Sequence, residues 1–250
     1  MSKPTLAQRV RSSIQEWVRI GAPPSLLRWI AHGVTLDWAA EPPPPFQLDN
    51  YKIPPEAAEW WRGGEEQRML EIGAIEPGQR RTHVSPAFLV PKSKPGQWRL
   101  VIDLRRLNSY GLKRSVRLET LKHVRHVAQE EDYMLIVDIQ DGFYHLEIAE
   151  GDRDYLTFEL FGRLYRLRCL PMGWTNSPYY FCKLMSVVNQ FIRDPELATR
   201  RLYRRALSKR RRARQPGVRM VGYMDDLLFF LSAKQAQGST VQFLKDTLVG

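Results

Sequence analysis

Apolar and polar residues alternate with the period of a β-strand in several stretches of this chain. In W-R-L-V-I-D-L, Leu100 and Ile102 alternate with Arg99 and Asp103, which predicts a strand with one buried face. Residues 133–139 form an almost continuously apolar run, typical of a strand buried on both faces. The run M-V-G-Y-M-D-D-L-L-F-F-L places two aspartates between apolar segments, and this pattern predicts a hairpin.

Other segments carry the spacing of amphipathic helices. We expect helices over residues 6–20, 118–131, 177–188 and 240–248. Asn176 or Ser177 is a suitable N-cap for the third of these. A helix that begins at Pro54 should break at a Gly-Gly pair, resume and end before Gly73. Alternation over residues 144–169 predicts a meander of short strands, so the whole mixture indicates an α+β fold.

Composition limits the class of protein. The 250 residues are 43% hydrophobic and 26% charged, which indicates a globular chain with one large or two modest domains. No apolar segment approaches the roughly 20 residues that span a bilayer, and the amino terminus has no apolar signal core. We therefore expect no membrane partner and an intracellular location, cytoplasmic or nuclear and not secreted.

The net charge of +11 suits a polyanionic partner, but one segment carries most of it. Between Arg193 and Arg219, eleven lysines and arginines stand against Asp194 and Glu196, which is a local charge of +9. Three interpretations of this segment stay open: a mobile insertion with non-specific affinity for polyanions, a contact to nucleic acid, or a nuclear-import signal.

Three aspartates are the candidates for chemistry. Asp138 and Asp225 stand at the ends of two apolar strands, 87 residues apart, and Asp226 follows directly. If the strands are neighbours, these carboxylates converge, and converging carboxylates are costly to bury unless they bind a cation. Mg²⁺ prefers oxygen ligands, and two such ions can clamp both oxygens of a phosphoryl displacement. The alternative is that all three are turn residues, and spacing alone leaves both interpretations open.

Four motifs follow one another along the chain. W-R-L-V-I-D-L-R-R-L-N precedes V-D-I-Q-D-G-F-Y-H-L, then L-P-M-G-W-T-N-S-P-Y-Y-F, then Y-M-D-D. This ordered set resembles the fingers and palm of reverse transcriptases, especially those of retrotransposons of the tyrosine-recombinase or gypsy type. The resemblance covers roughly residues 55–250, and an ordered set of four motifs is far more specific than a single Y-M-D-D.

The resemblance implies a right-hand polymerase fold with a small antiparallel palm sheet flanked by helices. It divides the chain into an amino-terminal extension over residues 1–45 with a proline-rich end, a fingers-like region over 46–132, and a palm-like region over 133–250 with a basic insertion at 193–219. The thumb that grips the duplex in this family does not fit into residues 227–250 and is expected to be absent. We therefore expect a fragment or a decayed copy, truncated at its carboxy end.

The activity that the resemblance implies is RNA-directed DNA polymerisation, in which a primer 3′-hydroxyl attacks the α-phosphorus of a dNTP opposite an RNA or DNA template. Asp138 and Asp225 match the two principal ligands of a pair of Mg²⁺ ions, with Mn²⁺ as the other ion considered. Asp226 matches the third catalytic carboxylate. Ile139 would lend its backbone carbonyl to the nucleotide-bound metal.

Other matching positions would contact the incoming nucleotide. Lys92 and Arg99 match the residues that hold its triphosphate, Lys as a point charge and Arg through its planar fork. Phe143 matches the aromatic steric gate, whose ring leaves no room for a ribose 2′-hydroxyl. Asp141 and Gly142 belong to the same nucleotide-pocket stretch.

The remaining matches concern the template and primer. Gly173 and Ser177 would let the backbone approach the new base pair closely, and Tyr223 and Met224 would shape the primer side. Met172 stands where many viral relatives carry Gln, and a thioether is only a weak acceptor, so sugar discrimination should differ.

Two other functions stay open at this point. A catalytically silent, nucleic-acid-binding remnant of a retroelement fits the truncated end. An RNA-dependent RNA polymerase has a similar palm, although Phe143 argues against it.

Overall fold

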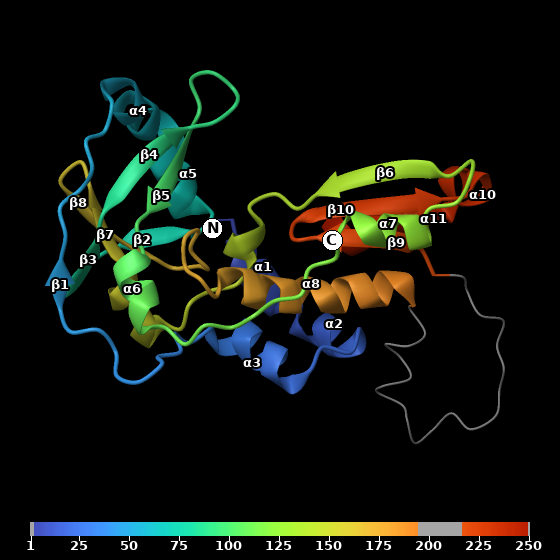
Figure 1. Cartoon of the computed structure of the whole chain (residues 1–250), viewed down its shortest axis with the longest axis horizontal. Coiled ribbons are helices and arrows are strands. Elements are labelled where there is room, and N and C mark those ends of the chain that lie inside the picture. Colours follow the sequence, from blue (N-terminus) through green and yellow to red (C-terminus); the bar gives the residue numbers. More distant parts are fainter. Residues whose placement is uncertain (1–2, 195–216, 250) are drawn as a thin grey trace. The chain divides into compact units, whose positions relative to one another are not determined.

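The computed structural model describes residues 3–194 and 217–249 (Figure 1). The helices are α1 (Leu6–Ser12), α2 (Ile14–Arg19), α3 (Pro24–His32), α4 (Pro55–Trp60), α5 (Glu66–Glu71), α6 (Arg105–Tyr110), α7 (Leu121–Val127), α8 (Ser177–Arg193), α10 (Ala233–Gln237) and α11 (Ser239–Val249). The strands are β1 (Phe46–Gln47), β2 (Ile75–Pro77), β3 (His83–Ser85), β4 (Ala87–Pro91), β5 (Trp98–Ile102), β6 (Tyr133–Asp138), β7 (Thr157–Leu160), β8 (Arg163–Leu167), β9 (Arg219–Tyr223) and β10 (Asp226–Leu231). This is the expected mixture of helices and strands, in which most neighbouring strands are antiparallel but the β1–β3 and β3–β7 pairs are parallel.

The chain forms two compact units that are not continuous in sequence. Unit 1 contains Met1–Ile14, Arg28–Ser115 and Phe143–Tyr180, and unit 2 contains Gln15–Leu27, Val116–Gly142 and Phe181–Gly250. These compact units are defined by packing, and the division into an amino-terminal extension, a fingers-like and a palm-like region stays a prediction.

Unit 1 holds two sheets. The larger has the strand order β1-β3-β7-β8-β2, and its β7–β8 hairpin turns at Phe161 and Gly162, both with positive φ. Phe158 and Leu160 of β7 are fully buried. Strands β4 and β5 form a separate antiparallel pair, in which Leu100 and Ile102 are buried as their alternation predicted.

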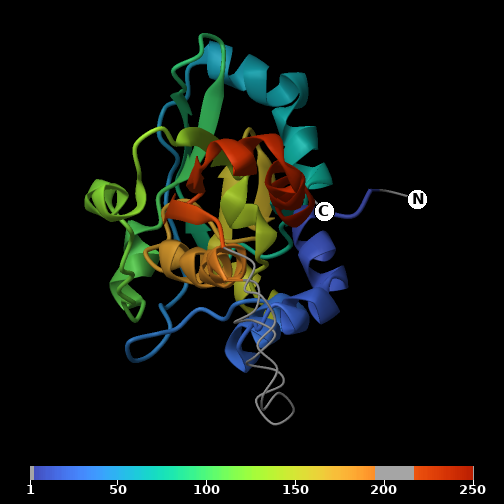
Figure 2. The ribbon, with the colours of Figure 1, turned by 90° about the vertical axis from the view of Figure 1, so that its right-hand side faces the viewer.

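One kinked helical run, blue-green in Figure 2, precedes β2 in the sequence of unit 1. Pro55 occupies the first turn of α4, and the π-helical segment Trp61–Glu65 joins α4 to α5. Gly64 has φ of 142°, which only glycine adopts readily, so the Gly-Gly pair produces the kink. The run ends before Gly73, whose φ of 72° is that of a helix-terminating glycine, and both ends were predicted.

Several residues between Arg28 and Leu36 contribute to the core of unit 1. Val34 is fully buried, pairs with Ile148 as an isolated bridge, and donates its N–H to the carbonyl of Glu147. Gly33 lies so close to Ala149 that an added Cβ would meet its backbone nitrogen at 2.6 Å. Ile30 lies in α3, whereas Val34 and Leu36 follow Gly33 beyond the end of that helix, so no single periodic pattern joins these buried residues.

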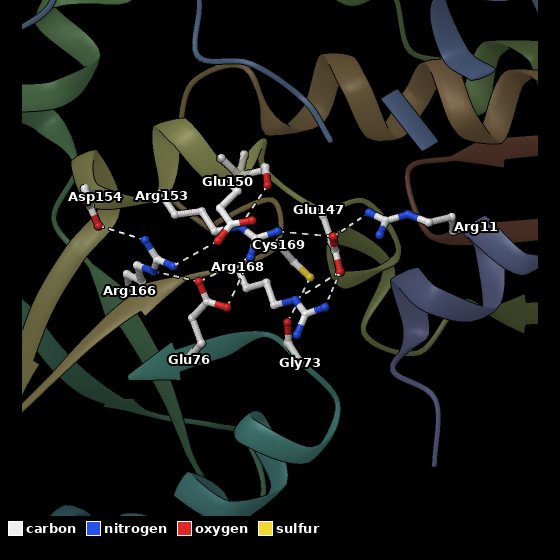
Figure 3. A network of polar contacts seen from close by, with 11 residues as sticks. Arg11, Gly73, Glu76, Glu147, Glu150, Arg153, Asp154, Arg166, Arg168 and Cys169 are labelled. Carbon is white, nitrogen blue, oxygen red and sulfur yellow. Dashed lines mark hydrogen bonds and ion pairs between the residues drawn. The ribbon is translucent and has the colours of Figure 1, made fainter. Parts of the chain in front are cut away.

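A buried carboxylate joins distant parts of unit 1 (Figure 3). Glu147, only 4% exposed, accepts hydrogen bonds from Arg11 at 2.6 Å, from Arg153 at 3.2 Å and twice from Arg168 at 2.8 and 3.0 Å. Burial raises the pKa of Glu147, but the Arg168 charge and hydrogen bonds, with Arg11 and Arg153, outweigh it and lower the pKa below its ordinary value. Glu147 is therefore ionised at neutral pH and fixes α1 to the strand region.

Unit 2 is built on the sheet β6-β10-β9 (Figure 1). Both neighbouring pairs are antiparallel, and the central strand β10 buries Leu227, Phe229, Phe230 and Leu231. Helix α7 lies beside β9, and the core of the unit also receives apolar residues of α8. No helix among the described residues is both long and apolar enough to cross a membrane.

Most of the basic insertion at 193–219 lies outside the described residues, which omit 195–216. Its described ends form ion pairs: Arg193 with Glu119, and Arg219 with Asp132. The N–H of Val218 donates to the carbonyl of Ile192 at 3.2 Å, so the described residues on the two sides of the gap lie next to each other.

Candidate active site

The candidate site begins with the turn between β9 and β10. Tyr223 pairs with Asp226, so the turn has only two residues, Met224 and Asp225. Met224 has φ of 57°, the conformation that type II′ turns require at this position and that usually selects glycine. The predicted hairpin is thus confirmed, and its first turn residue is held in a conformation unfavourable for methionine.

Strand register brings the predicted carboxylates together within unit 2. Asp226 lies directly opposite Asp138 across the β6–β10 pair, so both side chains project from one face of the sheet. The N–H of Ile139 donates to the carbonyl of Asp225 at 2.9 Å, which ties the turn to the end of β6. The two strands are thus neighbours, as the convergence of carboxylates supposed, but the residue opposite Asp138 is Asp226, whereas the sequence favoured Asp225.

The surroundings of these carboxylates differ from expectation. Asp138, Asp225 and Asp226 are all exposed, and β6 was expected to be buried on both faces, which is wrong. Met134 and Ile136 of β6 are each 71% exposed, because β6 is an edge strand of the described sheet. The strand covered on both faces is the central one, β10.

The chemistry of the three aspartates suits a hard cation. They offer carboxylate oxygens, which Mg²⁺ prefers, and among the described residues no ion pair with a lysine or arginine neutralises them. The described residues contain no group of three or more His, Cys, Asp or Glu side chains already arranged to hold a metal. The structure therefore supplies converging ligands of the right type without a completed coordination shell.

Cys182 is a close neighbour of the turn. Cys182 of α8 lies with its Sγ 3.5 Å from the Sδ of Met224. Burial, together with the charge of Asp225, raises the pKa of the Cys182 thiol, so it is a packing group and not a thiolate.

The loop after β6 is also tightly packed. An added Cβ on Gly142 would meet the buried ring of Phe181 at 2.8 Å, so only glycine fits there. Asp141, just before it, has φ of 53°.

Lys92 and Arg99 come together on the β4–β5 hairpin of unit 1. Val90 pairs with Arg99, and the N–H of Lys92 donates to the carbonyl of Gln97 at 2.8 Å, which closes the hairpin. Lys92 and Arg99 are therefore diagonal neighbours on one face, and both are exposed. The hairpin therefore presents two cations to solvent, and their contact with a triphosphate stays a prediction.

The L-P-M-G loop of unit 1 holds three further predicted residues. Gly173 has φ of 100°, and its carbonyl accepts a hydrogen bond from Asn108 at 2.8 Å. Ser177 is fully buried, and its hydroxyl donates to the carbonyl of Pro171 at 2.6 Å, so its side chain holds the loop. Met172 is 40% exposed at the loop's surface. Phe143, also in unit 1, is the second residue of the short 3-10 turn Gly142–His145.

One polar cluster was not predicted as functional. Tyr51 and Arg105 both donate hydrogen bonds to Asp103, and a cavity of about 410 Å³ opens beside it, lined by Leu48, Asp103, Arg105 and Arg106. The Arg105 guanidinium, helped by the Tyr51 hydroxyl, holds the pKa of Asp103 well below its ordinary value despite burial. The spacing D-L-R in the first motif was the available signal, because it places an acid and a cation within reach of each other.

The comparisons with known proteins identify the class to which these features belong. A family model described as "Reverse transcriptase (RNA-dependent DNA polymerase)" matches residues 90–249. The chain belongs to this reverse transcriptase family, and the resemblance inferred from the four motifs is confirmed.

Relatives come from transposons and viruses. The chain is 30% identical over 148 residues to the "Retrovirus-related Pol polyprotein from transposon 412" of Drosophila melanogaster, which covers 57% of this chain and 12% of that protein. It is 27% identical to the "Gag-Pro-Pol polyprotein" of Sheep pulmonary adenomatosis virus, over 80% of this chain and 10% of that protein. The chain thus spans about a tenth of these relatives.

Solved structures agree on the fold. The foamy viral protease-reverse transcriptase dRH in complex with double-stranded DNA superposes with a TM-score of 0.66 at 16% identity, covering 96% of this chain and 41% of that chain. The native Prototype Foamy Virus Protease-Reverse Transcriptase gives a TM-score of 0.61 at 19% identity, covering 94% and 31%. The expected fold, with its small antiparallel sheet, is therefore confirmed.

Proposed function

We propose that this chain provides the fingers and palm of an RNA-directed DNA polymerase, which extends a primer 3′-hydroxyl with dNTPs along an RNA or DNA template. The observation that carries the proposal is the register of Asp138 opposite Asp226, next to a strained turn that holds Asp225. The foamy viral relatives bound to double-stranded DNA support a nucleic-acid partner.

The three carboxylates would hold two divalent ions, Mg²⁺ or Mn²⁺, with the Ile139 carbonyl as a further ligand. When bound, such ions lower the pKa of the primer hydroxyl and neutralise the charge of the triphosphate. The chain's own contribution is rigidity. The cross-strand pair keeps Asp138 and Asp226 on one face of the sheet, and the Ile139–Asp225 hydrogen bond fixes the backbone of Asp225 beside them.

The β4–β5 hairpin would orient the triphosphate. Lys92 and Arg99 offer two exposed cations on one face, and charge-assisted hydrogen bonds to phosphate oxygens are about twice as strong as neutral ones. A strand pair closed by the Lys92–Gln97 hydrogen bond holds these side chains more rigidly than a loop would. The Asp103–Arg105–Arg106 cavity on the same unit offers a further cationic surface for a phosphate backbone.

The sugar would be selected by Phe143, whose ring excludes a 2′-hydroxyl, and Asp141 and Gly142 belong to the same nucleotide-binding stretch of the sequence. Met172 at the surface of its loop contributes apolar contact without a strong hydrogen bond. Backbone of the Gly173–Ser177 loop would face the new base pair.

Tyr223, 51% exposed beside the turn, and Met224 would face the primer end. Their position next to Asp225 would align the 3′-hydroxyl with the metal-binding carboxylates.

The test is primer extension by the protein that contains this chain, with Asp225→Asn as the variant. We expect loss of dNTP incorporation with RNA binding largely unchanged, because the substitution removes one charge from a site that does not carry the duplex. Asp49→Asn, an exposed carboxylate in unit 1, is the matched control and should retain incorporation. Retained dNTP incorporation by Asp225→Asn would refute the assignment of Asp225 as a metal ligand. Equal incorporation rates with rNTPs and dNTPs would favour an RNA-dependent RNA polymerase.

A further inference from the structure

Strand β9 carries the Y-M-D-D turn, and its outer edge has no partner strand among the described residues. The sheet order is β6-β10-β9, so one row of β9 backbone groups points away from the sheet. Unpaired edge groups normally bond to water or to another chain. Here two side chains of unit 2 take that place: Glu119 accepts the N–H of Gly222 at 2.7 Å, and Arg193 donates to the carbonyl of Met220 at 3.0 Å.

The two side chains also bind each other. Arg193 donates to the same carboxylate oxygen of Glu119 at 2.6 Å, so the pair closes a ring with the backbone of β9. Burial raises the pKa of Glu119, but the hydrogen bonds from Arg193 and from the Gly222 N–H outweigh it and lower the pKa below its ordinary value. Glu119 is therefore ionised at neutral pH, when these bonds are strongest.

In the described part of the chain, the outer edge of β9 is not closely packed by other side chains beside these two hydrogen bonds. A cavity of about 150 Å³ opens at the same edge, and its lining includes Glu119, Arg193, Gly222 and Met224. On its other side Gly222 is in close contact with α8, since an added Cβ would lie 2.5 Å from the Asn189 amide nitrogen. Among the described residues, the hydrogen bonds of Glu119 and Arg193 therefore hold the backbone at the outer edge of β9 next to the turn.

We propose that Glu119 and Arg193 are positioning residues that fix β9 and, through it, the Met224–Asp225 turn. Gly222 pairs with Leu227, and the next pair, Tyr223 with Asp226, closes the turn. The far end of the turn is tied to β6 by the Ile139–Asp225 hydrogen bond. A shift of the β9 edge therefore moves Asp225 relative to Asp138. The consequence for catalysis rests on the proposed polymerase function, whereas the restraint on the turn does not.

Amide hydrogen exchange of the full protein tests the restraint without requiring activity. In Glu119→Ala, the amides of Gly222 and Ile139 should both exchange about tenfold faster, because the loss of one hydrogen bond to a charged group corresponds to roughly that factor. Glu119→Gln retains a carbonyl oxygen for the Gly222 N–H, and its exchange at both amides should stay near that of the parent. In single-nucleotide incorporation, Glu119→Ala should lower kcat about tenfold with KM for the dNTP unchanged, and Glu119→Gln should restore most of kcat.

Asp132→Asn is the matched control, because it breaks the other ion pair on β9, that of Arg219, at the end of the strand far from the turn. It should lower thermal stability while leaving kcat and the two amides unchanged. Faster exchange at Gly222 alone in Glu119→Ala would overturn the proposal, and so would an equal loss of kcat in Asp132→Asn. A parent protein without incorporation would refute the polymerase function, and the exchange at Ile139 would still decide the restraint.

Discussion

Two residues near the carboxylates have backbone conformations that their side chains disfavour. Met224 and Asp141 have φ of 57° and 53°, and such non-glycine positions cost of order 1–3 kcal/mol each. Strain of this size persists only where the surrounding structure imposes it. Both residues lie in the motifs that carry the candidate site, at the turn after β9 and in the loop after β6. The strain is therefore consistent with a site held in one conformation before ligands bind.

Replacing Gly142 with alanine should reduce the free energy of unfolding. Gly142→Ala would place a Cβ 2.8 Å from the ring of Phe181, which is almost fully buried and has little space to move. Overpacking of this kind costs typically 1–3 kcal/mol. We expect the free energy of unfolding, measured in urea, to fall by about that amount.

Gly151→Ala is the control for this substitution. Nothing lies within 4 Å of an added Cβ at Gly151, and the residue is exposed. Its unfolding curve should match that of the parent within about 0.5 kcal/mol. A Gly142→Ala protein as stable as this control would show that Phe181 can move aside.

At the scale of elements, local signals predicted the hairpins and long-range packing decided the rest. The alternation of Leu100 with Ile102 and the apolar runs around the Y-M-D-D turn identified β5, β9 and β10 correctly. Residues 144–149, expected as a strand, instead pair only through the isolated bridges of Glu147 and Ile148, between two 3-10 turns. Alternation alone cannot say whether a partner strand is available.

The same limit applies to β6. Its apolar run was correct as a strand but gave the wrong burial, since a sequence does not say which strand will be central. The sequence did indicate that the strand ends carrying Asp138 and the Y-M-D-D turn are neighbours, but it favoured Asp225 as the residue opposite Asp138, and the register places Asp226 there. The clamp of Glu119 on β9 could not be foreseen, because it joins residues more than 100 positions apart.

The β4–β5 hairpin permits a test of the nucleotide-binding proposal. Lys92→Ala and Arg99→Ala should each raise KM for the dNTP by about tenfold or more, because a hydrogen bond to a charged group contributes roughly 1.5–3 kcal/mol. Steady-state incorporation of a single nucleotide measures the effect. Lys94→Ala, an exposed cation in the same turn, is the matched control and should change KM less than about twofold. Equal effects at all three positions would indicate only a general attraction of charge.

At the scale of the whole molecule, charged side chains connect segments that are far apart in sequence. Within unit 1, Glu147 joins Arg11 of α1 to Arg168, and Arg153 also pairs with Glu76 of β2 (Figure 3). A reading of the sequence treats such residues as surface charges, because glutamate and arginine are rarely buried. Their burial depends on partners that only the folded chain brings together.

Glu147→Gln should therefore be strongly destabilising at neutral pH. Removing one partner of a buried ion pair leaves uncompensated charge, and the cost is about 3–5 kcal/mol. The folded-state pKa of Glu147 is lowered, so its contribution is complete above the ordinary glutamate pKa of about 4.3 and is lost as pH falls through the folded value. Urea unfolding of parent and variant should differ most at pH 7 and converge on acidification. Glu150→Gln, whose carboxylate is 82% exposed and 3.9 Å from Arg166, should change stability by less than about 0.5 kcal/mol. A gap between parent and Glu147→Gln that stayed constant down to pH 3 would mean that the lost charge is not its cause.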